Sequence, residues 1–128
     1  MVTGLVKGLE LKEYLERWFQ GETMEVGLYL AMAKRAEEEC YPEVAALFRK
    51  IAWDEASHAA IAAELAGKVG STKENLEKMI EGEGKAAEMR LKEAEHHDDP
   101  AKSYFYTTGK DEECHRKALE AVYAKYFK

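Results

Sequence analysis

The chain has 128 residues, of which 46% are hydrophobic and 34% charged, and its formal net charge is −6 at pH 7. This length fits one domain that can bury a core without disulfide or metal staples. The negative charge argues against a nucleic-acid-binding surface. The chain has two prolines and many Ala, Glu, Lys and Leu residues, a composition typical of helices rather than sheets.

No segment approaches the ~20 apolar residues that a membrane-spanning helix needs. Residues 1–9 are too short and too glycine-interrupted for a signal peptide, so we expect a cytoplasmic protein without a membrane partner. Cys40 and Cys114 are isolated and no C-x-x-C pair occurs. The chain therefore cannot build a zinc ribbon or a rubredoxin-type iron site from its own residues, and two free thiols are expected.

Helical periodicity predicts a first helix from Leu9 to about Cys40, with an apolar face interrupted midway by Glu22. Tyr41-Pro42 ends this helix and starts the next, because Pro suits the first helical position and disfavours helical geometry in the residue before it. The second helix extends to about Ala66. Its apolar face is interrupted by the motif Glu55-x-x-His58.

The second half of the chain repeats this pattern. Ser71-x-x-Glu74 has the spacing of a capping box, which predicts the start of a third helix that runs to about His97 and carries Glu83 on its apolar face. Asp99-Pro100 predicts an N-cap followed by Pro at the first position of a fourth helix, which carries Glu112-x-x-His115. We thus expect a single all-α domain, residues 1–128, made of helical hairpins at about 9–66 and 72–127.

A carboxylate interrupts each of the four apolar faces, which predicts a site for metal ions. A Glu and a His three residues apart on a helix project from the same face and can reach one ion. An unpaired ionised carboxylate in an apolar core costs several kcal/mol, and four carboxylates balance two divalent cations. Oxygen and nitrogen donors without thiolate suit two iron or manganese ions, or a mixed pair, better than a structural zinc site. The predicted ligands are Glu22, Glu55, His58, Glu83, Glu112 and His115, a pattern typical of a ferritin-like four-helix bundle.

Several stretches of the sequence match motifs of one protein family: Gly21-Glu22, Tyr41 to Ala52, Glu55-x-x-His58, Asn75-Leu76 and Ile80 to Glu83. Through them nearly the whole chain resembles the rubrerythrins. The resemblance implies a di-iron oxidoreductase that reduces hydrogen peroxide and protects the cell against oxidative stress.

The resemblance also implies roles for individual residues. Glu55 and Glu112 correspond to carboxylates that bridge the two irons. Glu22 and His58 would complete the coordination of one iron, and Glu83 and His115 that of the other. Tyr29 matches a family tyrosine that hydrogen-bonds a ligand near the site and is the candidate catalytic residue.

The chain departs from the family pattern at three points. The family has an extra Glu three residues after the third-helix ligand, which exchanges with a histidine when the irons change oxidation state, and here that position is Ala86. A second family tyrosine falls at about Leu91. Family members usually have a C-terminal rubredoxin domain, whose cysteines these 128 residues lack, so we expect an external electron donor such as a rubredoxin-like protein.

The connection between the hairpins predicts the oligomeric state. Bundles of this type run up, down, down, up, and the crossover must then pass nearly 20 helical residues, roughly 28 Å, whereas the five residues 67–71 reach about 18 Å. We therefore expect a domain-swapped homodimer, in which the first hairpin packs against the second hairpin of a partner. An up-down-up-down bundle within one chain is the alternative.

Two other functions remain open from the sequence. A ferroxidase or iron-storage protein would use the same ligands with oxygen rather than hydrogen peroxide as the oxidant. A metal-binding helical module would have no catalytic activity. Iron accumulation beyond two ions per subunit would favour storage.

Overall fold

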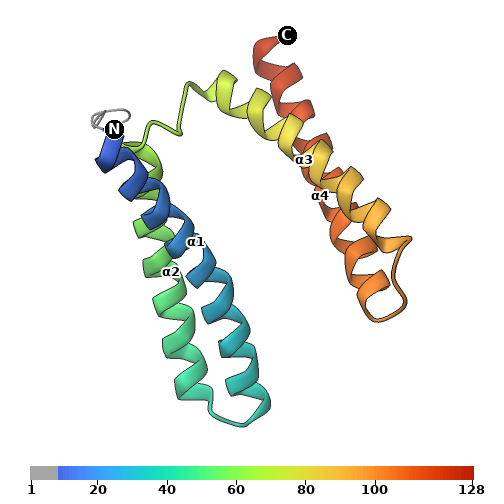
Figure 1. Ribbon diagram of the computed structural model, residues 1–128. Helices are drawn as coiled ribbons and strands as arrows, with labels where there is room; N and C mark the ends of the chain where they lie inside the picture. Colours follow the sequence, from blue (N-terminus) through green and yellow to red (C-terminus); the bar gives the residue numbers. More distant parts are fainter. Residues whose placement is uncertain (1–8) are drawn as a thin grey trace. The chain divides into compact units, whose positions relative to one another are not determined.

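The computed structural model describes residues 9–128 of the chain, so the expectation for the N-terminal segment lies outside the described residues. The described part contains four helices and no strand: α1 (Leu9–Glu38), α2 (Pro42–Leu65), α3 (Thr72–Ala94) and α4 (Ala101–Phe127) (Figure 1). This confirms the all-α prediction. Within residues 9–128, no helix is both long enough and apolar enough to cross a membrane.

The helices form two hairpins. Helix α1 packs along α2, and α3 packs along α4 (Figure 1). The described residues divide accordingly into two compact units, one that ends at Val69 and one that spans residues 70–128. Each unit contains one helical hairpin, and each hairpin brings together one Glu-bearing helix with one helix that carries a Glu-x-x-His motif.

Helix α1 ends at Glu38, slightly before the predicted end near Cys40, because the turn to α2 begins there. The Tyr41 amide donates to the Ala36 carbonyl (2.7 Å), and the Cys40 amide donates to the Glu37 carbonyl (3.0 Å). This pair of bonds is the Schellman pattern, which ends a helix by placing one residue in the left-handed region, usually glycine. Here that residue is Cys40, with φ of 65°. Pro42 then occupies the first turn of α2, as predicted.

The connection between α2 and α3 is held at both ends by hydrogen bonds. Gly67, with φ of 74°, closes α2 by the same Schellman pattern. The predicted capping box is confirmed, since Ser71 Oγ accepts from the Glu74 amide (3.2 Å) and Glu74 Oε2 accepts from the Ser71 amide (2.8 Å). The Asn75 side chain also bonds both backbone groups of Gly70. These bonds fix where α3 starts.

The turn between α3 and α4 differs from the prediction. Helix α3 ends at Ala94 rather than near His97, and α4 begins at Ala101, so that Pro100 rather than Asp99 stands at the N-cap position. The Asp99 carboxylate still satisfies a free amide of the first turn, because its Oδ1 accepts from the Ser103 amide (3.0 Å). Asp99 therefore caps α4 from the residue before the N-cap rather than from the N-cap itself.

Small residues hold each hairpin together. Among the side chains that the structure describes, the buried hydrophobic ones are one leucine and eight alanines: Leu15, Ala33, Ala36, Ala45, Ala52, Ala59, Ala62, Ala87 and Ala94. In the second hairpin Gly109 is also buried, and a Cβ there would lie 2.9 Å from Leu91 Cδ2. Alanine and glycine contacts let two helix backbones approach closely, but they bury little apolar area.

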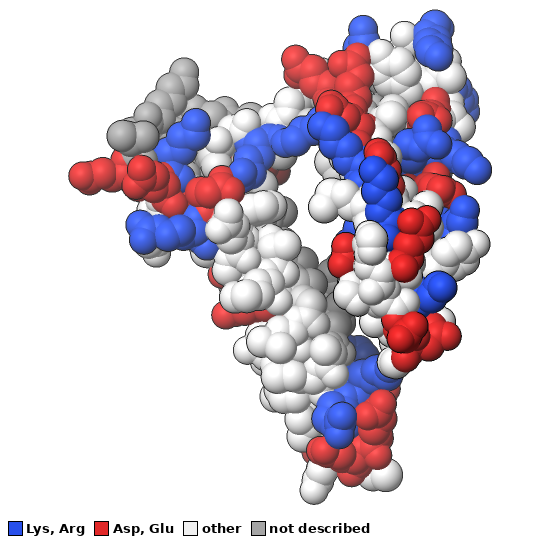
Figure 2. Space-filling model, turned by 45° about the vertical axis from the view of Figure 1, so that its right-hand side comes forward, with Lys and Arg blue, Asp and Glu red and all other residues white. Residues whose placement is uncertain are grey.

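Much of the apolar surface remains exposed on each hairpin. On the first hairpin the exposed side chains include Met24, Leu28, Leu47 and Trp53, and the second exposes Met89. Figure 2 shows a long uncharged stretch on the α1–α2 hairpin, with charged side chains gathered at its tip. An apolar surface of this extent is typical of a face that packs against another structural element.

Replacing Cys40 with glycine is expected to stabilise the first hairpin. Glycine adopts the left-handed conformation at Cys40 without the clash of a Cβ, so Cys40→Gly should raise the free energy of unfolding by about 0.5–1 kcal/mol. Thermal melting followed by circular dichroism measures the change. Cys40→Ala is the matched control, since it removes the thiol but keeps the Cβ. Equal melting temperatures for the two variants would contradict the assignment of strain to this backbone position.

Candidate metal centre

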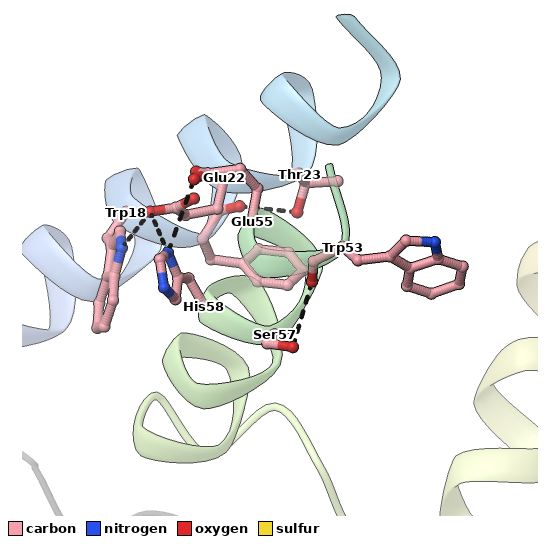
Figure 3. Close-up of polar contacts among 8 residues, drawn as sticks. Trp18, Glu22, Thr23, Trp53, Glu55, Ser57 and His58 are labelled. Atoms are coloured by element: carbon pink, nitrogen blue, oxygen red, sulfur yellow. Dashed lines mark hydrogen bonds and ion pairs between the residues drawn. The ribbon is translucent and has the colours of Figure 1, made fainter. Parts of the chain in front are cut away.

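The first hairpin brings together three of the six predicted ligands. Glu22 comes from α1, and Glu55 and His58 come from α2 (Figure 3). One ligand atom from each of them lies within 4.8 Å of the others. His58 Nδ1 is 3.6 Å from Glu22 Oε1 and 3.9 Å from Glu55 Oε1. We call this group the first half-site.

Local sequence explains this convergence. Glu55 and His58 are three residues apart, so both project toward α1 from successive turns of α2. Ala52 and Ala59, one turn before and one turn after Glu55, are 2% and 7% exposed. Because these side chains are small, α1 approaches α2 closely at this level, and Glu22 comes within reach.

A tryptophan orients Glu22. Trp18 Nε1 donates a hydrogen bond of 2.8 Å to Glu22 Oε1, one helical turn further along α1 (Figure 3). The sequence places Trp18 on the apolar face but does not assign it this bond. The spacing of four residues between an indole donor and a carboxylate is the signal that could have found it. Trp53, the other tryptophan, points away from the half-site (Figure 3) and is 75% exposed.

The second hairpin repeats the arrangement. Glu83 comes from α3, Glu112 and His115 come from α4, and their ligand atoms also lie within 4.8 Å of one another. His115 Nδ1 is 3.6 Å from Glu83 Oε2 and 3.7 Å from Glu112 Oε1. We call this group the second half-site. Arg90 on α3, which the sequence did not single out, lies 3.7 Å from Glu112 through Nη1 and Oε2.

The donor sets of both half-sites fit metal ions. Within residues 9–128, the Oε2 atoms of Glu22 and Glu83 are buried and have no hydrogen-bond partner. A buried carboxylate oxygen without a donor is costly, and a cation removes that cost. Two carboxylates and one imidazole at each half-site are donors that iron, manganese and zinc accept. The ligand assignment itself stays a prediction, which this geometry supports.

Repulsion between carboxylates shifts the pKa values in both half-sites. The hydrogen bond that a protonated Glu55 makes to Glu22, together with the nearby Glu25 carboxylate, raises the pKa of Glu55 to about 7. The same shared proton, with the Trp18 bond, lowers the pKa of Glu22. In the second half-site the neighbouring Glu83 raises the pKa of Glu112. Such pairs release their protons readily when a cation binds.

The structure also locates the remaining residues of interest. The Tyr29 ring packs against Phe48 with a centroid distance of 5.8 Å. Tyr29 lies on α1 two turns from Glu22, so its catalytic role stays a prediction. Ala86 lies on α3 three residues after Glu83 and is partly buried. Cys40 and Cys114 are both free and exposed, as expected.

The chain is similar in sequence to one described family and to individual proteins of other organisms. A family model described as rubrerythrin matches residues 13–123. An uncharacterized protein of Methanocaldococcus jannaschii is 43% identical, over 98% of this chain and 92% of that protein. A protein of Clostridium acetobutylicum named reverse rubrerythrin-1 is 39% identical, over 98% of this chain and 74% of the relative.

The raised carboxyl pKa values predict how the stability of the metal-free protein depends on pH. A carboxyl group whose pKa is higher in the folded state than in the unfolded state stabilises the fold at low pH, and this contribution is lost as pH rises through the folded value. For Glu55 that value is about 7. The melting temperature of metal-free protein should therefore fall between pH 5.5 and pH 8, as measured by circular dichroism.

Two controls accompany this measurement. Glu55→Gln removes the titrating group, so its melting temperature should depend less on pH over the same interval. Bound metal should reverse the trend, because ligands must lose their protons to bind it. A metal-free melting temperature that rises from pH 5.5 to pH 8 would contradict the pKa assignment.

Proposed function

The chain belongs to the rubrerythrin family, and on that premise we propose that it is a di-iron protein that reduces hydrogen peroxide with electrons from a separate donor. Such an activity would protect the cell against oxidative stress. The observation that carries the proposal is the pair of half-sites, each with two carboxylates, one imidazole and a buried carboxylate oxygen without a hydrogen-bond donor.

The six predicted ligands would hold the two ions. Their four carboxylates carry the charge that neutralises two divalent cations, and the two imidazoles add no charge. Held there in the ferrous state, the two ions would supply the two electrons that, with two protons, convert hydrogen peroxide to two water molecules. Manganese or a mixed pair could occupy the same ligands, but the family supports iron.

The chain's own residues prepare this site before any ion binds. The Trp18 indole fixes the orientation of the Glu22 carboxylate, so less ordering is needed when an ion arrives. The side chains of His58 and His115 are 48% and 58% exposed, which leaves a route for the ions. Tyr29 carries a phenolic O–H on the same helix as Glu22, and we propose that it orients the oxidant or supplies a proton.

The electron donor is proposed to be a separate protein. Within these 128 residues the cysteines are Cys40 and Cys114, which lie in different hairpins and form no C-x-x-C pair. Two such thiols cannot build the four-cysteine iron site of a rubredoxin-like carrier. Sustained turnover should therefore require an added carrier and its reductase.

Stopped-flow mixing tests the choice of oxidant. The di-ferrous protein should be oxidised by one equivalent of hydrogen peroxide at least ~10-fold faster than by oxygen, a difference of about 1.4 kcal/mol in barrier. The physical reason is that two electrons reduce peroxide completely to water, whereas the same two electrons convert oxygen only to hydrogen peroxide. Protein loaded with zinc is the control, since it cannot supply electrons. Faster oxidation by oxygen, followed by iron mineral formation, would assign a ferroxidase instead.

We further propose that the protein acts as a domain-swapped homodimer. Glu55 lies about 15 Å of helix before the end of α2 at Leu65, and Glu83 lies about 16 Å of helix after the start of α3 at Thr72. In an up-down-down-up bundle the linker must run back past both lengths, about 31 Å, but residues 66–71 reach at most about 25 Å. A partner's hairpin removes this conflict and also covers apolar faces that a lone hairpin exposes.

The positions of the histidines favour the same arrangement. His58 lies on the side of Glu55 nearer the linker, and His115 lies on the side of Glu112 nearer the start of α3. Two hairpins that pack with their linker ends opposed would place the imidazoles at opposite ends of the site. Each ion would then have one imidazole, with Glu55 and Glu112 between the ions. An up-down-up-down bundle closed within one chain would place both imidazoles at one end.

A complementation experiment tests the swap. One chain carries Glu22→Ala and Glu55→Ala, the other carries Glu83→Ala and Glu112→Ala, and a heterodimer is purified through two different affinity tags. In a swapped dimer, the intact hairpins of the two chains meet and form one complete two-ion site. In a dimer of self-contained bundles, every site contains a disabled half-site. Metal content and mass, measured by elemental analysis and light scattering, distinguish these outcomes.

The control heterodimer pairs the wild-type chain with a chain that carries all four substitutions. In a swapped dimer each of its sites contains one disabled half-site, so no complete two-ion site should form. A monomer with full metal content would overturn the proposal. Two ions in this control heterodimer, with none in the complemented one, would also overturn it.

A further inference from the structure

We propose that the two half-sites have unequal affinity for divalent cations, so that the first half-site fills first and Arg90 delays the filling of the second. This inference rests on the proposed two-ion function and adds an order of loading to it. The two hairpins repeat one ligand pattern, and the residues around each set of ligands can be compared position by position. Three such comparisons carry the inference.

The first comparison concerns the residue one turn before the Glu ligand of the first helix in each hairpin, which is Glu22 in α1 and Glu83 in α3. In the first hairpin this residue is Trp18, whose indole N–H holds Glu22 at 2.8 Å. The equivalent residue before Glu83 is Met79, whose side chain has no N–H or O–H to donate. Glu22 is therefore oriented before an ion binds, whereas Glu83 must be ordered by the ion itself. Preorganised ligands bind more tightly, because less conformational entropy is lost on binding.

The second comparison concerns the residue two turns after Glu22 in α1 and after Glu83 in α3. In the first hairpin this residue is Tyr29, and in the second it is Arg90, whose guanidinium lies 3.7 Å from Glu112 Oε2. Arginine stays protonated in proteins, so this positive charge is permanent. It already neutralises part of the Glu112 charge. A cation entering the second half-site must either displace the guanidinium or bind beside a like charge.

The third comparison concerns the residue one turn after Glu22 in α1 and after Glu83 in α3. Glu25 lies three residues after Glu22 on α1, so it lies on the same side of the helix and adds a third carboxylate near the first half-site. The equivalent residue in the second hairpin is Ala86, which lines an open groove with Met89, Arg90, Glu93 and Phe105. The first half-site thus has an extra negative charge nearby, and the second has an extra positive charge. Both differences favour the first half-site for a divalent cation.

The chain contains its own reporter for this order. Trp18 contacts a ligand of the first half-site, and Trp53 is the other tryptophan of the sequence. Trp53 is 75% exposed and points away from the ligands (Figure 3). Trp53→Phe therefore leaves Trp18 as the sole tryptophan without disturbing the site. Bound Co²⁺ is paramagnetic, so it should quench Trp18 when it occupies the first half-site.

Titration of full-length, metal-free Trp53→Phe protein with Co²⁺ tests the proposal. Calorimetry should resolve two ions per chain with affinities that differ at least ~10-fold, which corresponds to about 1.4 kcal/mol. Most of the fluorescence change should accompany the first ion. Two ions of equal affinity, or quenching that follows the second ion, would overturn the inference and leave the proposed function intact. Failure to bind two ions at all would overturn the proposed function itself.

Two substitutions in the second half-site make the test sharper. Arg90→Gln removes the guanidinium and should tighten the weaker step ~10-fold while leaving the tighter step unchanged. The matched control is Lys92→Gln, which removes a positive charge from the same helix, where Lys92 pairs with Glu88 at 3.1 Å. Ala86→Glu, which gives the second hairpin the carboxylate that the first has, should also tighten the weaker step. Equal effects of Arg90→Gln and Lys92→Gln would assign the change to net charge and overturn the role of Arg90.

Discussion

Repulsion between partly buried carboxylates is the constraint on which the structure depends. Each hairpin holds two Glu side chains and a His within a few ångströms, and Glu22 and Glu83 each keep a buried oxygen without a hydrogen-bond donor. Without a cation, the neighbouring Glu22 and Glu83 carboxyl groups raise the pKa values of Glu55 and Glu112, so a proton on one carboxylate of each pair lowers the repulsion. The fold therefore holds its acidic groups in a state that a divalent cation relieves.

The packing of the helices follows from the same constraint. Two carboxylates from neighbouring helices can converge only where the backbones are close, and the alanines that flank Glu55 and the buried Gly109 near Glu112 provide that closeness. Small residues, however, bury little apolar area, so larger side chains such as Trp53 and Met89 remain exposed on the hairpins. Metal binding and hairpin assembly should therefore be thermodynamically linked. Bound metal supplies the positive charge that a lone hairpin lacks, and a second hairpin covers its exposed apolar side chains.

The sequence predicted features that depend on short spacings. A Glu and a His three residues apart share a helix face whatever the rest of the fold, so the two Glu-x-x-His motifs located both groups of candidate ligands. The Ser71–Glu74 capping box was predicted for the same reason. The end of α1 was placed too late, since a left-handed position occupied by cysteine carries no glycine signal. Contacts between helices, such as Arg90 with Glu112, could not be read from the sequence because periodicity gives a face and not a partner.

The differences between the hairpins bear on how such a site can assemble in order. A fully symmetric pair of half-sites would bind the first ion in either position, and the partly loaded protein would be a mixture of two species. Here the Trp18 indole orients the Glu22 carboxylate in the first half-site, whereas the Arg90 guanidinium neutralises part of the Glu112 charge in the second half-site. The guanidinium lowers the electrostatic cost of the second half-site while that half-site is empty, so the singly loaded protein need not hold an uncompensated carboxylate pair. Since the Arg90 side chain is 42% exposed, it can turn toward solvent when the second ion replaces it as the partner of Glu112.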